Sequence, residues 1–197
     1  MGLVIAPDIF GLRPLFDALT ARLADEERVV ACAVEPFPGR DLPLDVEPRF
    51  AAVPSLRDDE VLGDLAAAAD VTGCDRVGLI GFCMGGMYAF EAAGLGRFDR
   101  IVSFYGMIRV PEAWKGEGHR EPLDAITRPG GSPVLAIIGE LDSYTPPPDV
   151  TALELAGAAV ARYPAAEHGF VHDEARPAHR ADDAYDAWTR AWAFLRG

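Results

Sequence analysis

The sequence has no apolar run long enough to cross a membrane, few basic residues and only three cysteines. The N-terminus also lacks a basic segment followed by an apolar core, so neither a membrane helix nor a secretory signal is expected. Eighteen Lys and Arg against 31 Asp and Glu give a net charge of −13, which argues against nucleic acid and anionic membrane surfaces as partners. Three irregularly spaced cysteines indicate no disulfide framework, and we expect a reducing, cytoplasmic location.

What is present is the pattern of a globular α/β protein. The 197 residues are 50% hydrophobic and 25% charged, which predicts a single domain over 1–197. Strands are expected at 3–6, 29–34, 77–80, 101–105, 134–139 and 159–163, and helices at 15–27, 58–71, 84–93, 149–156 and 179–195. The stretches 38–57 and 109–132, rich in Pro or Gly, are expected to be irregular. Strands separated by helices predict a mostly parallel sheet covered on both faces, a three-layer α/β fold.

A cysteine stands at the junction of an expected strand and helix. The motif reads Gly81-Phe82-Cys83-Met84-Gly85, the Gly-x-Cys-x-Gly form of a nucleophile elbow. The positive end of the following helix favours a thiolate there. Taken alone, the motif also fits a tight turn around a buried, inert cysteine. Cys32 and Cys74 are expected to be inert small residues.

An acid and a histidine follow later strands in the order that such folds use. Asp142 follows the strand at 134–139 and His168 the strand at 159–163. Because chemistry gathers at the carboxyl ends of parallel strands, these residues and Cys83 are expected to form a triad. Glu140 is an alternative to Asp142 as the acid, and His172 is an alternative to His168 as the base.

The sequence also indicates which groups would stabilise the negatively charged oxygen of the substrate, and whether a metal ion is to be expected. Backbone amides of Met84 and Ile9 are expected to form the oxyanion hole. His168 and His172 have a zinc-like spacing, but Gly169 and Val171 oppose a regular helix, so no metal or other cofactor is expected. His119 and His179 are expected to be solvated at the surface.

The chain resembles the dienelactone hydrolase family of cysteine-dependent α/β-hydrolases over almost its whole length. The most specific segments are 8–12, 81–86, 104–106, 139–142 with Pro146, and 167–170. The resemblance implies Cys83 as nucleophile, Asp142 as acid, His168 as base and a carboxylate at position 8 that contacts the resting thiol. The residues expected to contact substrate are Phe10, Arg13, Tyr105, Tyr144 and Phe170.

The sequence departs from the family in three places. The family usually has glutamate where this chain has Asp8, and the shorter side chain is expected to fall short of the thiol. The segment after His168 is acidic where a substrate-binding arginine is usual, which leaves Arg13 and Arg176 as candidate partners of a substrate carboxylate. Family members also carry about thirty residues before the segment that begins at Leu3. Either the true start lies upstream, or the sheet lacks the N-terminal strands and one edge strand is left for a partner chain to cover.

The sequence thus predicts a hydrolase of a small-molecule ester, lactone or thioester, acting as a monomer or homodimer. Two alternatives remain: a broad carboxylesterase or thioesterase, and a non-catalytic ligand-binding relative.

Overall fold

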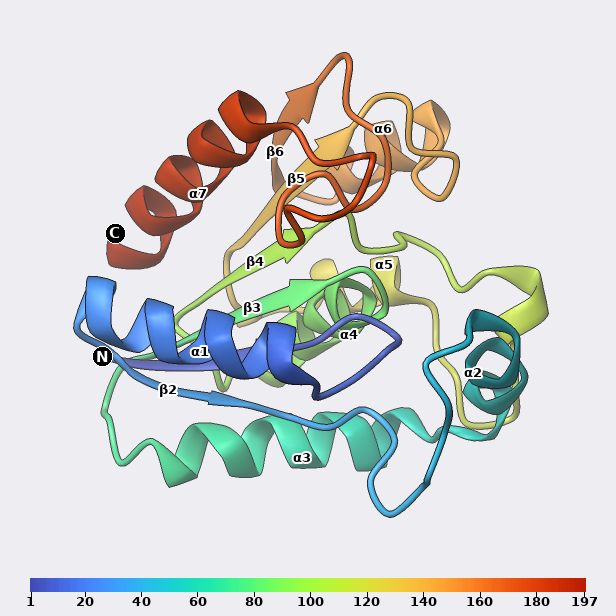
Figure 1. Ribbon diagram of the computed structural model, residues 1–197, viewed down its shortest axis with the longest axis horizontal. Coiled ribbons are helices and arrows are strands. Elements are labelled where there is room, and N and C mark those ends of the chain that lie inside the picture. The colour runs from blue at the N-terminus through green and yellow to red at the C-terminus, as the bar shows by residue number, and fades with distance from the viewer.

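A computed structural model describes residues 1–197, and one six-stranded sheet forms its centre. All five strand pairs are parallel, and the strand order is β2-β1-β3-β4-β5-β6 (Figure 1). The strands are β1 (Gly2–Ala6), β2 (Val30–Ala33), β3 (Val77–Phe82), β4 (Arg100–Phe104), β5 (Val134–Gly139) and β6 (Ala159–Tyr163). Their carboxyl ends therefore meet along one edge of the sheet, where the chemistry of such folds is found.

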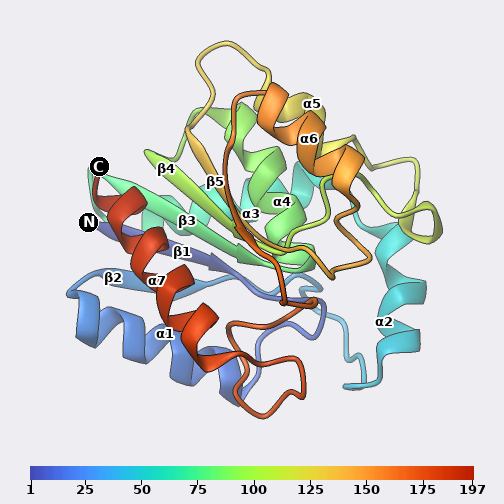
Figure 2. The ribbon, with the colours of Figure 1, turned by 90° about the horizontal axis from the view of Figure 1, so that it is seen from above.

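Helices cover both faces of this sheet. One face carries α1 (Pro14–Glu27) and α7 (Ala181–Arg196), as Figure 2 shows. The opposite face carries α3 (Asp58–Val71), α4 (Met84–Ala92), α5 (Pro122–Ile126) and α6 (Pro147–Leu155). The expected three-layer α/β-hydrolase arrangement is confirmed.

The burial pattern explains why these segments form these elements. Every residue of β1, β3 and β5 is buried, as expected for parallel strands with helices on both faces. All nine residues of α4 are buried as well, so this helix is enclosed rather than amphipathic. In α7, by contrast, Ala184, Ala187, Ala191 and Leu195 line a single buried stripe, which packs the helix onto the sheet.

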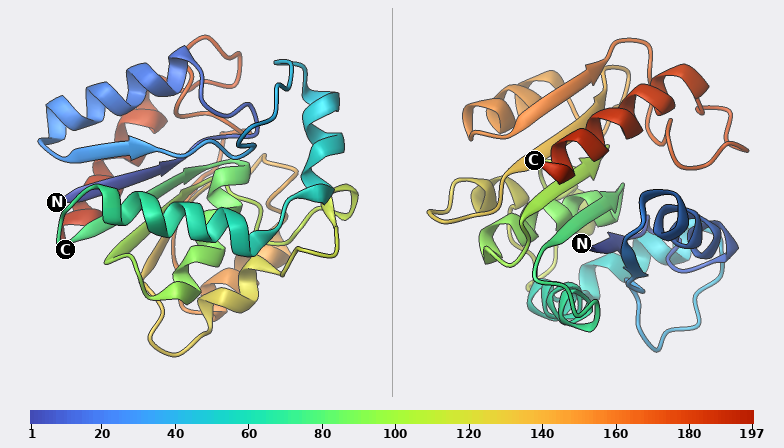
Figure 3. Two further views of the ribbon diagram at one scale, coloured as in Figure 1. Left: turned by 90° about the horizontal axis from the view of Figure 1, so that it is seen from below. Right: turned by 90° about the vertical axis from the view of Figure 1, so that its left-hand side faces the viewer.

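The two stretches expected to be irregular contain short helices, so that expectation is wrong in part. The first holds α2 (Val46–Ala52) and η1 (Val53–Ser55), and the second holds η3 (Glu112–Trp114) and α5. Contact between α2 and η3 stabilises them, with the rings of Phe50 and Trp114 5.4 Å apart. We call α2, η1 and η3 together the cap. It lies at the end of the molecule opposite the two chain termini (Figure 3).

His119 is a second correction, because it is not a solvated surface residue. Its side chain is only 2% exposed, and Nε2 lies 3.0 Å from the carbonyl oxygen of Val53 in the cap. The polar residues around it in the sequence misled the expectation, because they face solvent while the imidazole turns inward.

The outer strands of the sheet are β2 and β6. β2 is only partly buried, and Val30 on it is 52% exposed. None of the helices combines the length and apolar character that a membrane crossing requires.

Candidate active site

Cys83 stands on a strained turn between β3 and α4. Its backbone has φ 54° and ψ −115°, a region that residues with a side chain rarely adopt. A Cβ on Gly81 would lie 2.1 Å from the carbonyl oxygen of Gly85, and one on Gly85 would lie 2.1 Å from that of Ala6. Both positions therefore require glycine, and the turn is tight enough to present the thiol at its tip.

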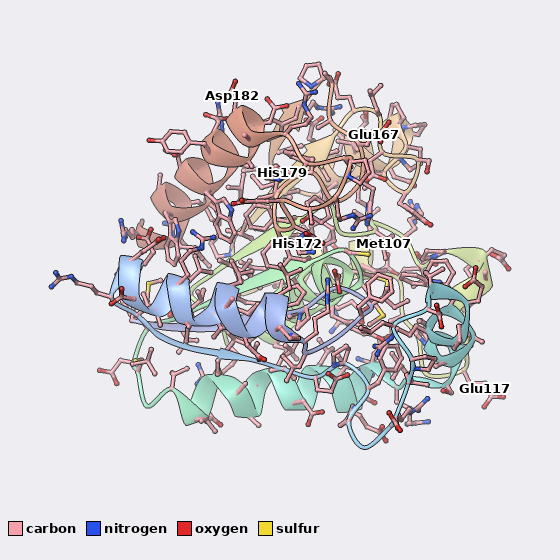
Figure 4. The ribbon with its side chains drawn as sticks, viewed as in Figure 1. Met107, Glu117, Glu167, His172, His179 and Asp182 are labelled. Carbon is pink, nitrogen blue, oxygen red and sulfur yellow. The ribbon has the colours of Figure 1, made fainter.

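The thiol faces a cavity of about 300 Å³ at the carboxyl ends of the strands. The cavity lies between these strand ends and the cap, and most of its lining is apolar. Figure 4 labels Met107, which lines the cavity, and His172, which binds the lining residue Asp8. The lining residues are Asp8, Ile9, Phe10, Val46, Phe50, Cys83, Met107, Trp114, Tyr144, His168 and Arg176.

His168 and Asp142 form a hydrogen-bonded pair beside the thiol. Nδ1 of His168 donates to Oδ2 of Asp142 over 2.8 Å, and the amide of Tyr144 donates to Oδ1 over 2.9 Å. Burial alone would lower the pKa of His168. The charge of a Cys83 thiolate and the hydrogen bonds with Asp142 and Cys83 outweigh burial and raise this pKa to about 10. A charged imidazole beside a thiol stabilises the ionised form of that thiol.

Asp8 lines the cavity, but its carboxylate is bound to other partners. Nη1 and Nη2 of Arg13 donate to it over 2.7 and 2.8 Å, and Nε2 of His172 donates over 2.9 Å. Burial would raise the pKa of Asp8, yet the hydrogen bonds from His172 and Arg13 and the charge of Arg13 lower it to about 2. Asp8 is therefore ionised, and no hydrogen bond joins it to Cys83.

The two expected oxyanion donors lie where the chain turns away from β1 and β3. Ile9 lines the cavity, and Met84 opens α4 directly after the thiol. The backbone hydrogen bonds of the surrounding turns do not use the amide of either residue. Both N–H groups are thus available to an acceptor next to Cys83.

The residues expected to contact substrate divide into two groups. Phe10 and Tyr144 line the cavity. Tyr105 and Phe170 are completely buried and lie outside the lining, while Arg13 is paired with Asp8. The backbone of Tyr105 has φ 42°, and its buried hydroxyl group contacts Nδ1 of His172.

His172 and Glu140, the alternatives to His168 and Asp142 in the triad, have different partners. His172 binds Asp8 and Tyr105, whereas His168 binds Asp142. Glu140 is exposed and forms no hydrogen bond or ion pair with either histidine. No cluster of three or more His, Cys, Asp or Glu side chains is arranged to hold a metal ion.

Several lining residues were missed by the sequence analysis. Val46 and Phe50 come from α2, and their spacing of four residues is the helical signal that could have revealed them. Met107 and Trp114 have no such signal. Arg176, a candidate from the sequence, lines the cavity and forms no ion pair with a carboxylate. Its guanidinium lies across Gly169, where a Cβ would approach Nη1 to 2.6 Å.

Comparisons with known proteins identify the family of this chain. All of residues 1–197 match the Dienelactone hydrolase family. A protein of Synechocystis sp. named "Putative carboxymethylenebutenolidase" is 30% identical over 95% of this chain and 82% of its own length. The carboxymethylenebutenolidase of Pseudomonas putida is 32% identical over 53% of this chain. The aligned region spans half the length of that second relative.

Solved structures support the same fold. A dienelactone hydrolase-like promiscuous phosphotriesterase from metagenomic libraries superposes with a TM-score of 0.76 at 22% identity, covering 99% of this chain and 85% of its own. A carboxylesterase of Lactobacillus plantarum superposes with a TM-score of 0.65 at 14% identity, covering 100% and 87%. At these identities the likeness concerns the fold alone.

Proposed function

Because the chain belongs to the dienelactone hydrolase family and is a hydrolase of ester bonds, we propose that it cleaves its substrate through a triad of Cys83, His168 and Asp142. The observation that carries this proposal is the position of the His168 ring. Nδ1 is 2.8 Å from a buried carboxylate of Asp142, and the same side chain lines the cavity beside Cys83, close enough to interact with its thiol. A thiol nucleophile requires such a base, with a carboxylate that orients the ring of the base.

The reaction then follows from the groups in the cavity. The Cys83 thiolate attacks the carbonyl carbon, and the electron pair of the C=O bond moves to oxygen, which accepts hydrogen bonds from the amides of Ile9 and Met84. The tetrahedral intermediate collapses, and the departing oxygen or sulfur takes a proton from the His168 imidazolium. A thioester on Cys83 remains.

Water completes the cycle. The neutral His168 removes a proton from a water molecule as its oxygen attacks the thioester carbonyl. Collapse of the second tetrahedral intermediate releases the carboxylic acid and restores the thiolate. Asp142 orients the ring and stabilises its cationic form throughout.

The cavity indicates the class of substrate. At about 300 Å³ with mostly apolar walls it suits a small ester, lactone or thioester. Arg176 supplies a positive charge at the wall without an ion-pair partner. We therefore propose that the preferred substrate carries a carboxylate that binds Arg176.

Hydrolysis of short chromogenic esters tests both parts. Cys83→Ala is expected to abolish activity, whereas Cys32→Ala and Cys74→Ala, which replace cysteines outside the cavity, retain it. Arg176→Gln is expected to raise KM for an ester bearing a carboxylate about tenfold or more and to leave KM for a neutral ester unchanged. Comparable loss in a Cys32 or Cys74 variant, or an equal effect on both esters, would refute the respective part.

A further inference from the structure

The carboxylate of Asp8 has no acceptor position left for the thiol of Cys83. Oδ1 accepts the amide of Phe10 over 3.0 Å and Nη1 of Arg13 over 2.7 Å. Oδ2 accepts Nη2 of Arg13 over 2.8 Å and Nε2 of His172 over 2.9 Å. An ionised carboxylate offers about four lone-pair positions, and these four donors occupy them. Asp8 is therefore an anchor for its own loop.

The anchored loop carries the amide of Ile9. The peptide unit between Ile9 and Phe10 is held at both ends, because its N–H donates to Asp8 and its carbonyl oxygen accepts Nη1 of Arg49 over 3.0 Å. Arg49 comes from α2 and is only 6% exposed. The Ile9 N–H belongs to the preceding peptide unit, whose carbonyl oxygen on Asp8 accepts the amide of Gly11 over 2.9 Å. Because the peptide units on either side of the Ile9 Cα are held in this way, the orientation of the Ile9 N–H depends on the loop that the Asp8 carboxylate fixes.

His172 in turn fixes that carboxylate, and its protonation follows from its partners. Ionised Asp8 can only accept, so Nε2 of His172 must carry the proton. The hydroxyl group of Tyr105 lies against Nδ1 and donates to it, which satisfies both ring nitrogens of a neutral imidazole. Burial lowers the pKa of His172 despite the neighbouring Asp8, in agreement with a neutral ring.

The ring of His172 is also held by packing. Phe16 of α1 stacks on it at 5.5 Å between centroids, and Phe82 of β3 lies 5.1 Å away. These contacts and Tyr105 join the segments that follow β1, β4 and β6. The imidazole therefore has one position from which Nε2 can donate.

We propose that His172 is a positioning residue for ester hydrolysis: through Asp8 it holds the loop that directs the Ile9 amide at the oxyanion. The proposal rests on the proposed function, because only an acyl-transfer reaction develops an oxyanion beside Cys83. In this proposal Asp8 holds the loop that carries the Ile9 amide and does not restrain the thiol of Cys83. A misplaced oxyanion donor weakens the transition state and leaves substrate binding nearly intact.

Two substitutions at one position separate the roles of the two ring nitrogens. The amide nitrogen of glutamine reaches the place of Nε2 and can still donate to Asp8, whereas that of asparagine reaches only the place of Nδ1. We expect His172→Asn to lower kcat for a neutral chromogenic ester about 10- to 100-fold with KM changed less than about threefold. We expect His172→Gln to recover most of that loss. Glu174→Gln, at an exposed position of the same segment, is the matched control.

Alkylation of Cys83 by iodoacetamide supplies a readout that needs no oxyanion hole. We expect its rate in His172→Asn to stay within about twofold of the unmodified protein. Unchanged kcat in His172→Asn, equal losses in the Asn and Gln variants, or a loss confined to KM would overturn the proposal. A large acceleration of alkylation would also overturn it, because it would show that the Asp8 network restrains the thiol.

These experiments distinguish failure of the proposal for His172 from failure of the proposed triad. If Cys83→Ala still hydrolyses the ester, the proposed function fails, and if only the His172 comparison fails, the triad stands. Should His172→Asn not fold, as judged by its thermal transition, Asp8→Asn tests the same support. It is expected to show the same loss of kcat with unchanged alkylation, and a variant that alkylates faster would contradict the proposal.

Discussion

Nδ1 of His168 lies 2.8 Å from Oδ2 of Asp142, whose side chain is completely buried. A carboxylate in this position selects the tautomer that leaves Nε2 free for the thiol. Asp142→Asn keeps the size of the side chain but allows its amide to present a donor to the ring. We expect kcat to fall on the order of 1,000-fold with little change in KM. Steady-state kinetics on a chromogenic ester measures this, and a loss of less than about tenfold would exclude Asp142 from the triad.

The pair formed by Cys83 and His168 predicts how resting thiol reactivity depends on pH. The pKa of His168 is raised to about 10 beside the thiolate, so the imidazolium persists through neutral pH and is lost only as pH rises through that value. Alkylation of Cys83 is therefore expected to be nearly constant between about pH 6 and 8.

His168→Asn is the matched variant for that profile. Without the imidazolium, alkylation at neutral pH is expected to fall about tenfold and to rise with pH as for an ordinary thiol. If the two proteins gave the same profile, the ion pair would not exist in the resting state.

Replacing two glycines by alanine, one at a time, separates the steric demand of the turn around Cys83 from the general effect of an added methyl group on stability. A Cβ on Gly85 would lie 2.1 Å from the carbonyl oxygen of Ala6, whereas Gly63 in α3 has open space. We expect Gly85→Ala to cost about 2 kcal/mol or more in stability and to abolish hydrolysis. Gly63→Ala should raise stability by about 0.5–1 kcal/mol, because alanine favours the helix. Urea unfolding measures both, and a tolerated Gly85→Ala would argue against the tight turn.

A buried carboxyl group away from the cavity predicts a pH-dependent stability. Glu91 in α4 is 3% exposed, and neither of its oxygens has a hydrogen-bond partner. Burial, then the charge of Asp58, raises its pKa from 4.5 to about 9. Below pH 4.5 folded and unfolded chains both hold the proton, whereas between 4.5 and 9 only the folded chain does. The contribution of Glu91 to stability is therefore lost as pH rises across this window.

Glu91→Gln removes that titration and tests it. We expect the variant to melt several degrees higher than the unmodified protein at pH 8 and at nearly the same temperature near pH 4.5, since about 1 kcal/mol corresponds to about 2–4 °C. Glu117→Gln, at an exposed position (Figure 4), is the control and should show no pH-dependent difference. A difference that does not grow with pH would contradict the raised pKa.

The sequence allowed the sheet and the positions of Cys83, Asp142 and His168 to be predicted, because each signal is local. An apolar run marks a strand, and a polar residue just after it must lie at the carboxyl edge of a parallel sheet. The glycines around Cys83 similarly report a turn formed by adjacent residues.

What could not be predicted depends on contacts between distant segments. Tyr105 follows a strand as His168 does, but its hydroxyl group is buried against His172, 67 residues away. The short helices of the cap are stabilised by packing such as that of Phe50 on Trp114. Asp8 could have met the thiol, Arg13 or His172, and only the folded arrangement decides among them.

The most direct measurement of the central claim is identification of the residue that carries the acyl group during turnover. The protein is mixed with an excess of a short-chain chromogenic ester, quenched in acid within the first turnovers, digested and analysed by mass spectrometry. We expect the acyl group as a thioester on the peptide that contains Cys83, and none in Cys83→Ala. Acylation of another residue, or steady turnover by Cys83→Ala, would contradict the account.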